Sequence, residues 1–350
     1  MIHSLTDGAL DIVGDIHGES DALSALLTRL GYDRSGHHPQ GRKLVFVGDL
    51  CDRGPDSPEV IDQVRRIVEG GNGQAILGNH EMNLLRGERK DGNDWFWNET
   101  SAKDRKYEPY TRLARSHRDS ILSFLADLPL ALERDDLRVV HAAWHQDSFQ
   151  RATGISGGIQ EQFNHWERHT DLEISSRGLL TQSAAEKDLW GHALDDPHQR
   201  VPLLKATGTC DELRQMANPL RVLTSGIERL TKEPFFSGGQ WRFVERVRWW
   251  DEYHDAKAVV VGHYWRRYVA MDASQIGKGG PNLFETVAPN AWHGVRGNVF
   301  CVDFSVGGRF HERGADLLQG LTTKLAALRW PERTLVLDTG EEIPTGGFHA

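Results

Sequence analysis

The sequence predicts an α/β fold whose functional residues collect at one edge of a sheet. Three apolar, strand-like runs each end in a polar phrase flanked by glycine: Gly14-Asp15-Ile16-His17-Gly18, Gly48-Asp49-Leu50-Cys51-Asp52-Arg53-Gly54 and Gly78-Asn79-His80-Glu81. After the first two phrases, apolar residues recur at the spacing of a helix. Open α/β sheets place their ligands at the carboxyl ends of strands, so the three phrases are expected to lie side by side.

The first unit consists of a strand, a polar loop and a helix. The apolar run 10–13 reads as the strand, and leucines between Leu23 and Leu30 then recur on one face of a helix. Gly31 follows directly and is expected to end that helix. The loop between strand and helix carries the first polar phrase.

The second unit repeats this pattern, and the third begins in the same way. Residues 43–47 form the second predicted strand, with Ser57 as N-cap and Pro58 as the first helical residue. Apolar residues between Val60 and Val68 give this helix one buried face. A third strand over 74–77 leads into the third phrase.

The rest of the chain supplies further elements. A helix is expected over residues 110–128, with Pro129 after it, and a hairpin through Asp135-Asp136 leads to a strand over 137–140. Another apolar strand covers 258–261. The remaining expectations are a Gly-rich loop over 274–280 and two strands, 298–304 and 334–337, that complete the second sheet.

The composition is that of an ordinary globular protein. The chain has 350 residues, of which 39% are hydrophobic and 26% charged, and we expect one elaborated domain over 1–350. No stretch approaches the roughly 20 apolar residues that cross a bilayer, and the amino terminus lacks a signal-peptide pattern. The three cysteines are too few and too scattered for a disulfide framework. We therefore expect a cytoplasmic protein without a membrane partner.

The charge excludes one class of partner. The formal net charge is −9, and no long run of Lys or Arg occurs. Nucleic acid would not be attracted by such a field, so no stable nucleic-acid binding is expected. A local positive pocket for a phosphorylated substrate is compatible with this charge.

Residues 154–252 interrupt the alternation of strands and helices. They contain polar, helix-like stretches without clear strands and are predicted to form a helical insertion. Because the insertion starts and finishes beside ligand-bearing strands, it is a candidate lid or substrate platform; the alternative is a solvated embellishment without catalytic contact. Trp249 and Trp250 could stack on a nucleobase, although such tryptophans more often pack an insertion against the core.

The side chains offered by the loops are metal ligands or proton carriers. Two later histidines, His141 and His263, end apolar strands in the same manner. Several such side chains at the ends of neighbouring strands indicate a two-metal hydrolytic centre. The candidates are Asp15, His17, Asp49, Asn79, His80, His141 and His263.

Together these phrases resemble the calcineurin-like metallophosphoesterases of the phosphoprotein phosphatase type. The resemblance rests on Asp15-Ile16-His17, Asp49 with Asp52-Arg53-Gly54, Asn79-His80-Glu81, His141 and Gly262-His263. It is strong over residues 10–145 and is limited to separate motifs beyond them. It implies two mixed β-sheets sandwiched by helices in four layers, α/β/β/α, with the helical insertion added.

The resemblance also implies a role for each candidate residue. Asp15, His17 and Asp49 would hold the first metal, with Asp49 bridging, and Asn79, His141 and His263 would complete the second. His80 is similar to the general acid of the family, and Asp52 to the carboxylate that orients it. Arg53 would bind the phosphoryl oxygens, for which its planar fork is suited.

Two further side chains in the loops are given structural roles. Glu81 is expected to accept hydrogen bonds rather than to carry a proton. Cys51 is expected to fill space, because a redox role would require thiolate character.

The implied function is hydrolysis of phosphate esters through attack of a metal-bridging hydroxide. A serine/threonine protein phosphatase is the favoured hypothesis, because residues 49–54 resemble that branch. A diadenosine tetraphosphate hydrolase is the alternative, because residues 53–57 and the helix after them are similar to bacterial members. The aspartate at position 52, often absent from symmetric hydrolases, favours the phosphatase. A non-catalytic metal-binding scaffold is the remote alternative, and the filled ligand positions argue against it.

The cofactors and partners follow from the same resemblance. Nitrogen and oxygen donors accept manganese, iron, zinc or cobalt, and two manganese ions are the expected pair. The partner is a phosphorylated protein or a dinucleoside polyphosphate. A second phosphate-binding arginine of the family, between the last two histidine ligands, has no clear counterpart. The arginines considered in that interval are Arg177, Arg200, Arg214, Arg221 and Arg229.

Overall fold

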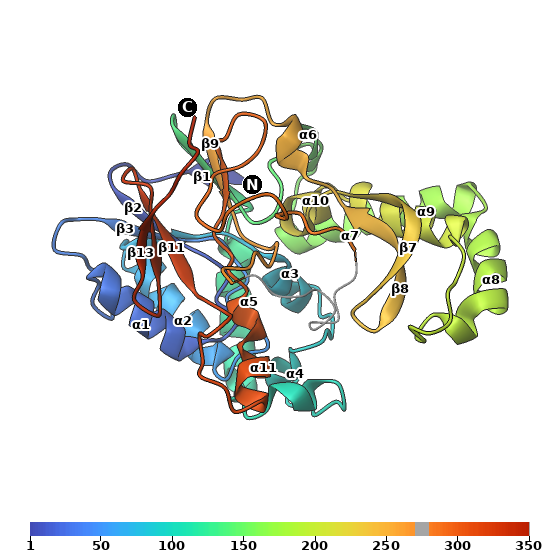
Figure 1. Cartoon of the computed structure of the whole chain (residues 1–350), viewed down its shortest axis with the longest axis horizontal. Helices are drawn as coiled ribbons and strands as arrows, with labels where there is room; N and C mark the ends of the chain where they lie inside the picture. The colour runs from blue at the N-terminus through green and yellow to red at the C-terminus, as the bar shows by residue number, and fades with distance from the viewer. Residues whose placement is uncertain (270–279, 350) are drawn as a thin grey trace.

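The first strand of the predicted α/β units lies inside a six-stranded sheet, with parallel neighbours on one side and antiparallel strands on the other (Figure 1). In this computed structural model, which describes residues 1–269 and 280–349, β2 pairs parallel with β3 and antiparallel with β11. In spatial order the strands are β13 (Glu342–Pro344), β12 (Thr334–Leu337), β11 (Ala326–Trp330), β2 (Leu10–Val13), β3 (Lys43–Phe46) and β4 (Gly73–Ala75).

The two later histidine strands belong to a second, five-stranded sheet. Here β6 pairs antiparallel with β5 and parallel with β9, and β9 pairs parallel with β10. In spatial order the strands are β1 (Ile2–Ser4), β5 (Ala131–Glu133), β6 (Leu137–Val140), β9 (Ala258–Val261) and β10 (Val299–Cys301). The two final predicted strands do not complete one sheet: β10 joins this sheet, whereas β12 joins the other.

The alternation of side chains along β2 explains how the layers pack. Leu10 and Ile12 lie in an apolar cluster that also contains Val139 and Val260 from the five-stranded sheet. The next residue, Val13, lies in a second cluster with leucines of the first helix. One face of the six-stranded sheet therefore packs on the other sheet, and its opposite face packs on helices, as the family resemblance implied.

The helices of the first two units cover the six-stranded sheet, and they begin and end close to the predicted residues. α1 (Ser20–Leu30) is followed by Gly31 in the left-handed conformation. α2 (Ser57–Glu69) begins one residue earlier than predicted, because Asp56 rather than Ser57 is the N-cap and accepts the capping bond from the backbone N–H of Glu59. The third phrase opens a helix that was not predicted, α3 (Asn79–Leu85).

The helix expected over 110–128 forms only in its second half, as α5 (Arg118–Asp127). The backbone groups before it form hydrogen bonds with other segments. The backbone N–H of Thr111 donates to the carbonyl oxygen of Pro55, and that of Leu113 donates to the carbonyl oxygen of Trp95. Tertiary hydrogen bonds thus replace the first turns of the expected helix. The short helix α4 (Asp94–Trp97) lies in the segment that receives one of these bonds.

The insertion projects from the sheets as a separate lobe (Figure 1). It contains strands, contrary to the prediction: β7 and β8 form a hairpin that turns at Gly238 and Gly239. The hairpin packs on α9 at Gly208, where a Cβ would lie 2.4 Å from Leu230. The elements from residue 146 to residue 246 are α6 (Gln146–Thr153), α7 (Ile159–Ser176), α8 (Leu179–Trp190), α9 (Lys205–Met216), α10 (Pro219–Ser225), β7 (Glu228–Ser237) and β8 (Gln240–Arg246).

The described part of the chain ends with α11 (Arg309–Gly314) and the antiparallel strands β11 to β13. The Gly-rich loop predicted over 274–280 lies outside the described residues except for Gly280. None of the described helices is both long and apolar enough to span a bilayer. The three cysteines are buried and unpaired, as expected.

Candidate metal centre

The polar loops meet at the carboxyl ends of strands from both sheets, and their backbones approach very closely. A Cβ on Gly262 would lie 2.0 Å from a carboxylate oxygen of Asp15, and a Cβ on Gly307 would lie 2.3 Å from the ring of His17. Only glycine fits at these two contacts. Three of the candidate ligands, His17, Asp49 and His263, have positive φ angles of 49°, 49° and 69°. Such strain is typical of functional sites.

Asp49 lies at the centre of the candidate ligands. Its Oδ2 is 3.3 Å from Nε2 of His141, 3.8 Å from Nε2 of His17 and 3.9 Å from Nε2 of His80. Its Oδ1 accepts a hydrogen bond from the backbone of His80 at 3.0 Å. Two groups with ligand atoms within 4.8 Å of one another share this carboxylate: His17, Asp49 and His80, and Asp49, His141 and His263. A shared carboxylate is the geometry of a bridging ligand.

Backbone carbonyl groups fix the orientation of two imidazoles. Nδ1 of His17 donates to Cys51 O at 3.1 Å, and Nδ1 of His141 donates to Val47 O at 2.7 Å. Each bond leaves Nε2 directed toward Asp49. Partners of this kind fix the tautomer and orientation of metal-binding histidines.

Asn79 and His263 stand on the other side of His141. Asn79 Oδ1 lies 2.9 Å from Nδ1 of His263 and 3.3 Å from Nε2 of His141. Asn79 is the first residue of α3, and Glu81 in the same turn accepts from the backbone N–H groups of Asp49, Leu50 and Gly78. Glu81 thus has the structural role expected of it and joins two of the ligand loops.

Asp15 is held against the last ligand. Both of its carboxylate oxygens accept from the backbone N–H of His263, at 3.2 and 3.0 Å, and Oδ2 lies 4.0 Å from Nε2 of His17. Burial and the charges of Asp303 and Asp49 raise the pKa of Asp15 well above its usual value. A bound cation would offset this repulsion between buried carboxylates.

Burial and neighbouring charges also shift the pKa values of two imidazoles and of Asp49. Burial, with the charge of Arg53, lowers the pKa of His17 well below its usual value. Burial opposes the charged form of His141, but the neighbouring Asp49 outweighs it and raises the pKa to about 10. The same cluster of charges holds the pKa of Asp49 well below its usual value, although burial alone would raise it.

The donor set fits divalent metal ions. Carboxylate oxygens, an amide oxygen and imidazole nitrogens converge in a buried site, and these are ligands for borderline divalent ions. The structure brings together all six predicted ligands, Asp15, His17, Asp49, Asn79, His141 and His263. It also places His80, whose predicted role was that of an acid, in the first group with His17 and Asp49.

His80 forms a buried pair with Asp52. Nδ1 of His80 lies 2.5 Å from Oδ2 of Asp52, as the sequence predicted. The other oxygen of Asp52 accepts from the indole N–H of Trp95 at 2.7 Å. No sequence signal pointed to Trp95, because it lies in the short helix α4, between α3 and α5, and reaches Asp52 only in the folded chain.

We predict that Trp95→Phe lowers kcat by about 10-fold to 100-fold, because a hydrogen bond to a charged group contributes roughly 1.5–3 kcal/mol. Without it, Asp52 is free to rotate away from His80. Steady-state kinetics on a phosphate ester with a poor leaving group measure the loss. Trp97→Phe is the matched control, since its indole donates to Asn93 rather than to Asp52. Equal losses in the two variants would contradict the prediction.

Arg53 contacts two imidazoles of the site. Its Nη1 donates to Nε2 of His17 at 3.0 Å, and its Nη2 donates to Nε2 of His80 at 3.1 Å. Its own backbone N–H donates to Gly92 O at 3.0 Å. The guanidinium therefore sits between a candidate ligand and the candidate acid, where the prediction placed a phosphoryl contact.

The five arginines considered from the sequence are used within the insertion. Each forms an ion pair with a carboxylate of that segment, and the pairs are Arg177 with Glu173, Arg200 with Glu233, Arg214 with Asp211, Arg221 with Glu167 and Arg229 with Glu245. A different arginine, Arg246, ends β8 beside the site. Its Cζ lies 5.9 Å from the ring centre of Tyr264, and burial together with its charge lowers the pKa of His263 well below the usual value.

Asp303 was also missed. Its carboxylate accepts from the backbone of Trp265 at 2.6 Å and from that of Ser305 at 2.8 Å, and it contributes to the shifted pKa of Asp15. It follows the apolar strand β10 by two residues, so the signal used for the candidate ligands was present in the sequence here as well.

Burial excludes base stacking by Trp249 and Trp250 and a redox role for Cys51. Trp249 and Trp250 are 4% and 1% exposed and pack in the core, which leaves no face for a base. Cys51 is fully buried, and burial together with the charges of Asp52 and Glu81 raises the pKa of its thiol well above the usual value. It is therefore a filler, as expected.

Parts of this chain are similar to two curated proteins. A bis(5'-nucleosyl)-tetraphosphatase (asymmetrical) from Halalkalibacterium halodurans is 48% identical over 79 residues, which are 22% of this chain and 32% of that protein. A symmetrical bis(5'-nucleosyl)-tetraphosphatase from Ralstonia nicotianae is 34% identical over 164 residues, 44% of this chain and 50% of that protein. The chain thus spans about a third to a half of the length of these relatives.

A solved structure and a family model extend the comparison. The cold-active protein-tyrosine phosphatase of a psychrophilic Shewanella sp. aligns with a TM-score of 0.44 at 15% identity, over 97% of this chain and 80% of that chain. The model of the calcineurin-like phosphoesterases matches residues 9–265, from the strand before Asp15 to the loop that holds His263. The chain therefore belongs to the calcineurin-like phosphoesterase family, as its three glycine-flanked phrases predicted.

Proposed function

We propose that the chain is a divalent-metal-dependent hydrolase of phosphoric esters. The observation that carries this proposal is that three features of a hydrolytic site lie together in one small region. Two groups of metal ligands share Asp49, the pair of His80 and Asp52 lies beside them, and Arg53 lies between His17 and His80. Metal binding alone would require neither the arginine nor the pair.

Each protein group has a defined task in this proposal. When bound, two divalent ions activate water and neutralise charge on the transferred phosphoryl group. Arg53 binds phosphoryl oxygens through its planar fork. Nε2 of His80 gives a proton to the departing oxygen, while Asp52 at Nδ1 orients the ring and stabilises its charged form.

The names of the relatives favour one of the two predicted substrates. Both relatives are named as bis(5'-nucleosyl)-tetraphosphatases, so a dinucleoside polyphosphate is the substrate we propose to test first. Phosphoserine or phosphothreonine in a protein is the second candidate, which the Asp52-Arg53-Gly54 phrase favours. Both substrates present a phosphoryl anion to the same arginine.

The test compares substrates on one preparation. Manganese-loaded protein is incubated with diadenosine tetraphosphate, with a phosphothreonine peptide and with an aryl phosphate. Nucleotides are measured by ion-exchange chromatography and phosphate by a colorimetric assay. Turnover that depends on added metal supports the proposal, and the preferred substrate identifies the branch. Stoichiometric metal binding without turnover of any of the three would instead favour the non-catalytic scaffold.

Manganese is the native ion we propose, with iron, zinc and cobalt as alternatives that the same donors accept. Loading the metal-free protein with each ion in turn, followed by the assay above, ranks them. A cytoplasmic location is part of the same proposal, since it would give access to either substrate.

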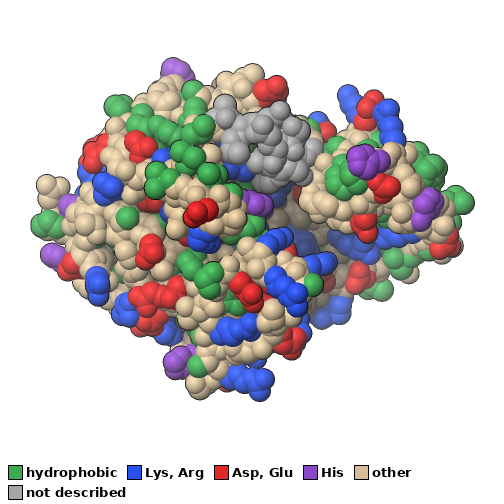
Figure 2. Space-filling view, turned by 60° about the horizontal axis from the view of Figure 1, so that its bottom comes forward, with side chains coloured by type: hydrophobic (Ala, Val, Ile, Leu, Met, Phe, Trp, Pro, Cys, Tyr) green, Lys and Arg blue, Asp and Glu red, His purple; other side chains and the backbone are tan. Residues whose placement is uncertain are grey.

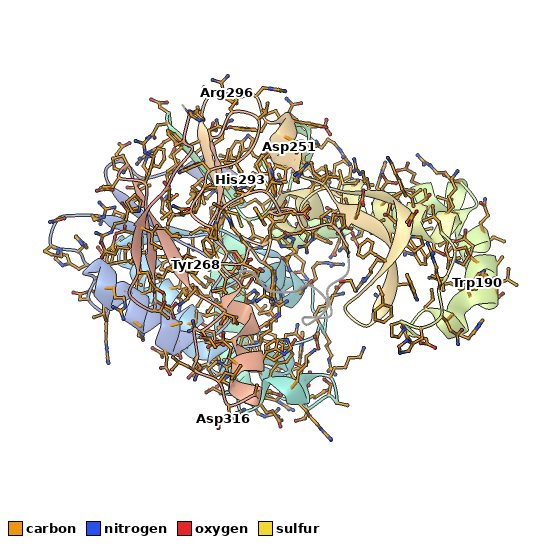
Figure 3. The ribbon with its side chains drawn as sticks, viewed as in Figure 1. Trp190, Asp251, Tyr268, His293, Arg296 and Asp316 are labelled. Atoms are coloured by element: carbon orange, nitrogen blue, oxygen red, sulfur yellow. The ribbon has the colours of Figure 1, made fainter. Side chains whose placement is uncertain are left out.

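The insertion is the proposed lid or substrate platform. Its outer end, marked by Trp190, lies far from Tyr268, which follows His263 and lies over the sheets (Figure 3). Within the insertion, the hairpin β7–β8 carries Arg246, whose charge lowers the pKa of His263. Lys and Arg side chains gather in the hollow between the lobe and the body (Figure 2), which suits an anionic substrate.

Arg246 is the proposed second phosphoryl contact. Arg246→Ala is predicted to raise KM by about tenfold, since a charged hydrogen bond contributes roughly 1.5–3 kcal/mol, and to leave the metal content unchanged. Arg229→Ala is the matched control, because it removes an arginine from the same hairpin that pairs with Glu245. Steady-state kinetics at saturating metal decide between them. An unchanged KM in Arg246→Ala would contradict this assignment.

A further inference from the structure

Trp265 has an unusual backbone at the rim of the site. Its φ angle is 53°, a region that bulky residues rarely adopt and that costs of order 1–3 kcal/mol. The buried carboxylate of Asp303 compensates, because it accepts from the backbone N–H of Trp265 at 2.6 Å. The chain thus keeps an unfavourable conformation at one large side chain, and this raises the question of what the indole contacts.

The indole lies near both Arg53 and a candidate metal ligand. Cζ of Arg53 is 4.6 Å from the ring centre of Trp265, within the range of a cation–π contact. The ring of His17 lies 6.0 Å from that of Trp265, at an angle of 43°. Unlike Trp249 and Trp250, which are buried in the core, Trp265 is partly exposed.

The guanidinium of Arg53 also donates to the imidazoles of His17 and His80. Among residues 1–269 and 280–349, no carboxylate lies within 4.0 Å of it. Its charge is therefore available for an anion. A carboxylate partner would have oriented this group at the expense of its affinity for phosphate. An aromatic face orients the guanidinium without using any of its five N–H donors, of which the two bonds to imidazoles use two.

We propose that Trp265 is a positioning residue for Arg53: its indole is the platform that holds the guanidinium flat between His17 and His80, ready to bind a phosphoryl anion. This proposal rests on the proposed function, because it takes that anion to be the phosphoryl group of the substrate. It assigns a role to the second residue after His263, and it explains why the strained backbone of Trp265 is kept.

The test is a double-mutant cycle with Trp265→Leu, Arg53→Ala and the double variant. Trp265→Leu is expected to lower kcat/KM about 5-fold to 30-fold, in keeping with a partly desolvated cation–π contact. In the Arg53→Ala background the same change is expected to have no further effect. Trp265→Phe, which keeps an aromatic face, is expected to recover most of the loss. If Trp265→Leu does not fold, Trp265→Gln, which also removes the aromatic face, takes its place in the cycle.

The control cycle uses a similar pair elsewhere in the chain. Arg151 stacks on Trp166 at the same 4.6 Å, and Arg151 also donates to backbone carbonyl groups of Met216 and Ala217 in the insertion. Trp166→Leu is expected to leave kcat/KM unchanged. Losses at Trp265 and Arg53 that add independently would overturn the proposal. So would a loss of bound metal in Trp265→Leu, which would mean that the indole supports His17 instead.

A second readout separates this proposal from the proposed function. Binding of inorganic phosphate to the metal-loaded protein, measured by calorimetry, requires no turnover. Weaker phosphate binding in Trp265→Leu, absent in the Arg53→Ala background, supports the positioning role even if no substrate is hydrolysed. Phosphate binding that Trp265→Leu does not change overturns it, whatever the enzyme assays show.

Discussion

The Asp49→Asn variant is expected to lose at least about 1000-fold in kcat/KM, because metal ions supply several kcal/mol of transition-state stabilisation and each tenfold in rate corresponds to about 1.4 kcal/mol. Asp49 is the one carboxylate common to both candidate ligand groups. An amide in its place has half the oxygen donors and no charge. Its NH₂ group would also face imidazole nitrogens that should bind cations.

Two measurements check this expectation. Elemental analysis after dialysis is expected to show less bound metal in Asp49→Asn than in the parent protein, and thermal melting is expected to show an intact fold. Asp251→Asn is the matched control, since it removes one carboxylate from the surface, where Asp251 pairs with Arg248. Retention of metal and of activity by Asp49→Asn would exclude a bridging role for this residue.

His80→Asn is expected to separate substrates by their leaving groups. General acid catalysis contributes about 10²-fold to 10⁴-fold, and it matters most when the departing oxygen is basic. The variant should therefore hydrolyse phenyl phosphate far more slowly than the parent, while p-nitrophenyl phosphate, whose leaving group needs little protonation, is affected much less. Steady-state kinetics on the two esters measure the difference.

The structure makes the metal content of His80→Asn informative as well. Nε2 of His80 lies 3.9 Å from the carboxylate of Asp49, close enough to belong to a ligand group. If His80 is a general acid and not a metal ligand, His80→Asn leaves the metal content unchanged. Equal losses on both esters, together with loss of one metal ion, would assign His80 as a ligand instead.

The predicted ligands were accessible from sequence because each one follows an apolar strand within four residues. Asp15, Asp49 and His141 need no knowledge of distant segments, since each ligand and its strand lie close together in the chain. Asp303 carries the same signal after β10, and it was missed only because its neighbours are not those of the family phrases. The hairpin β7–β8 was missed although Gly238-Gly239 marks its turn.

Other residues could not have been found in this way. Trp95 reaches Asp52, and Arg246 reaches the neighbourhood of His263, only because separate segments fold onto the ligand loops. The late start of α5 has the same origin, because the backbone of Thr111 and Leu113 bonds to other loops. Such contacts depend on tertiary packing, which local patterns do not encode.

The bond between Asp15 and the backbone of His263 joins residues 248 positions apart in the chain. Bringing such distant segments together is slow, because loop closure must occur before the contact contributes. A growing polypeptide that has passed Asn79 holds four of the six predicted ligands but cannot assemble the full set until the strand before His263 has emerged. Ions that bind only the complete set of ligands stabilise the folded chain by mass action. The supply of metal ions and the folding of the newly made chain are therefore linked.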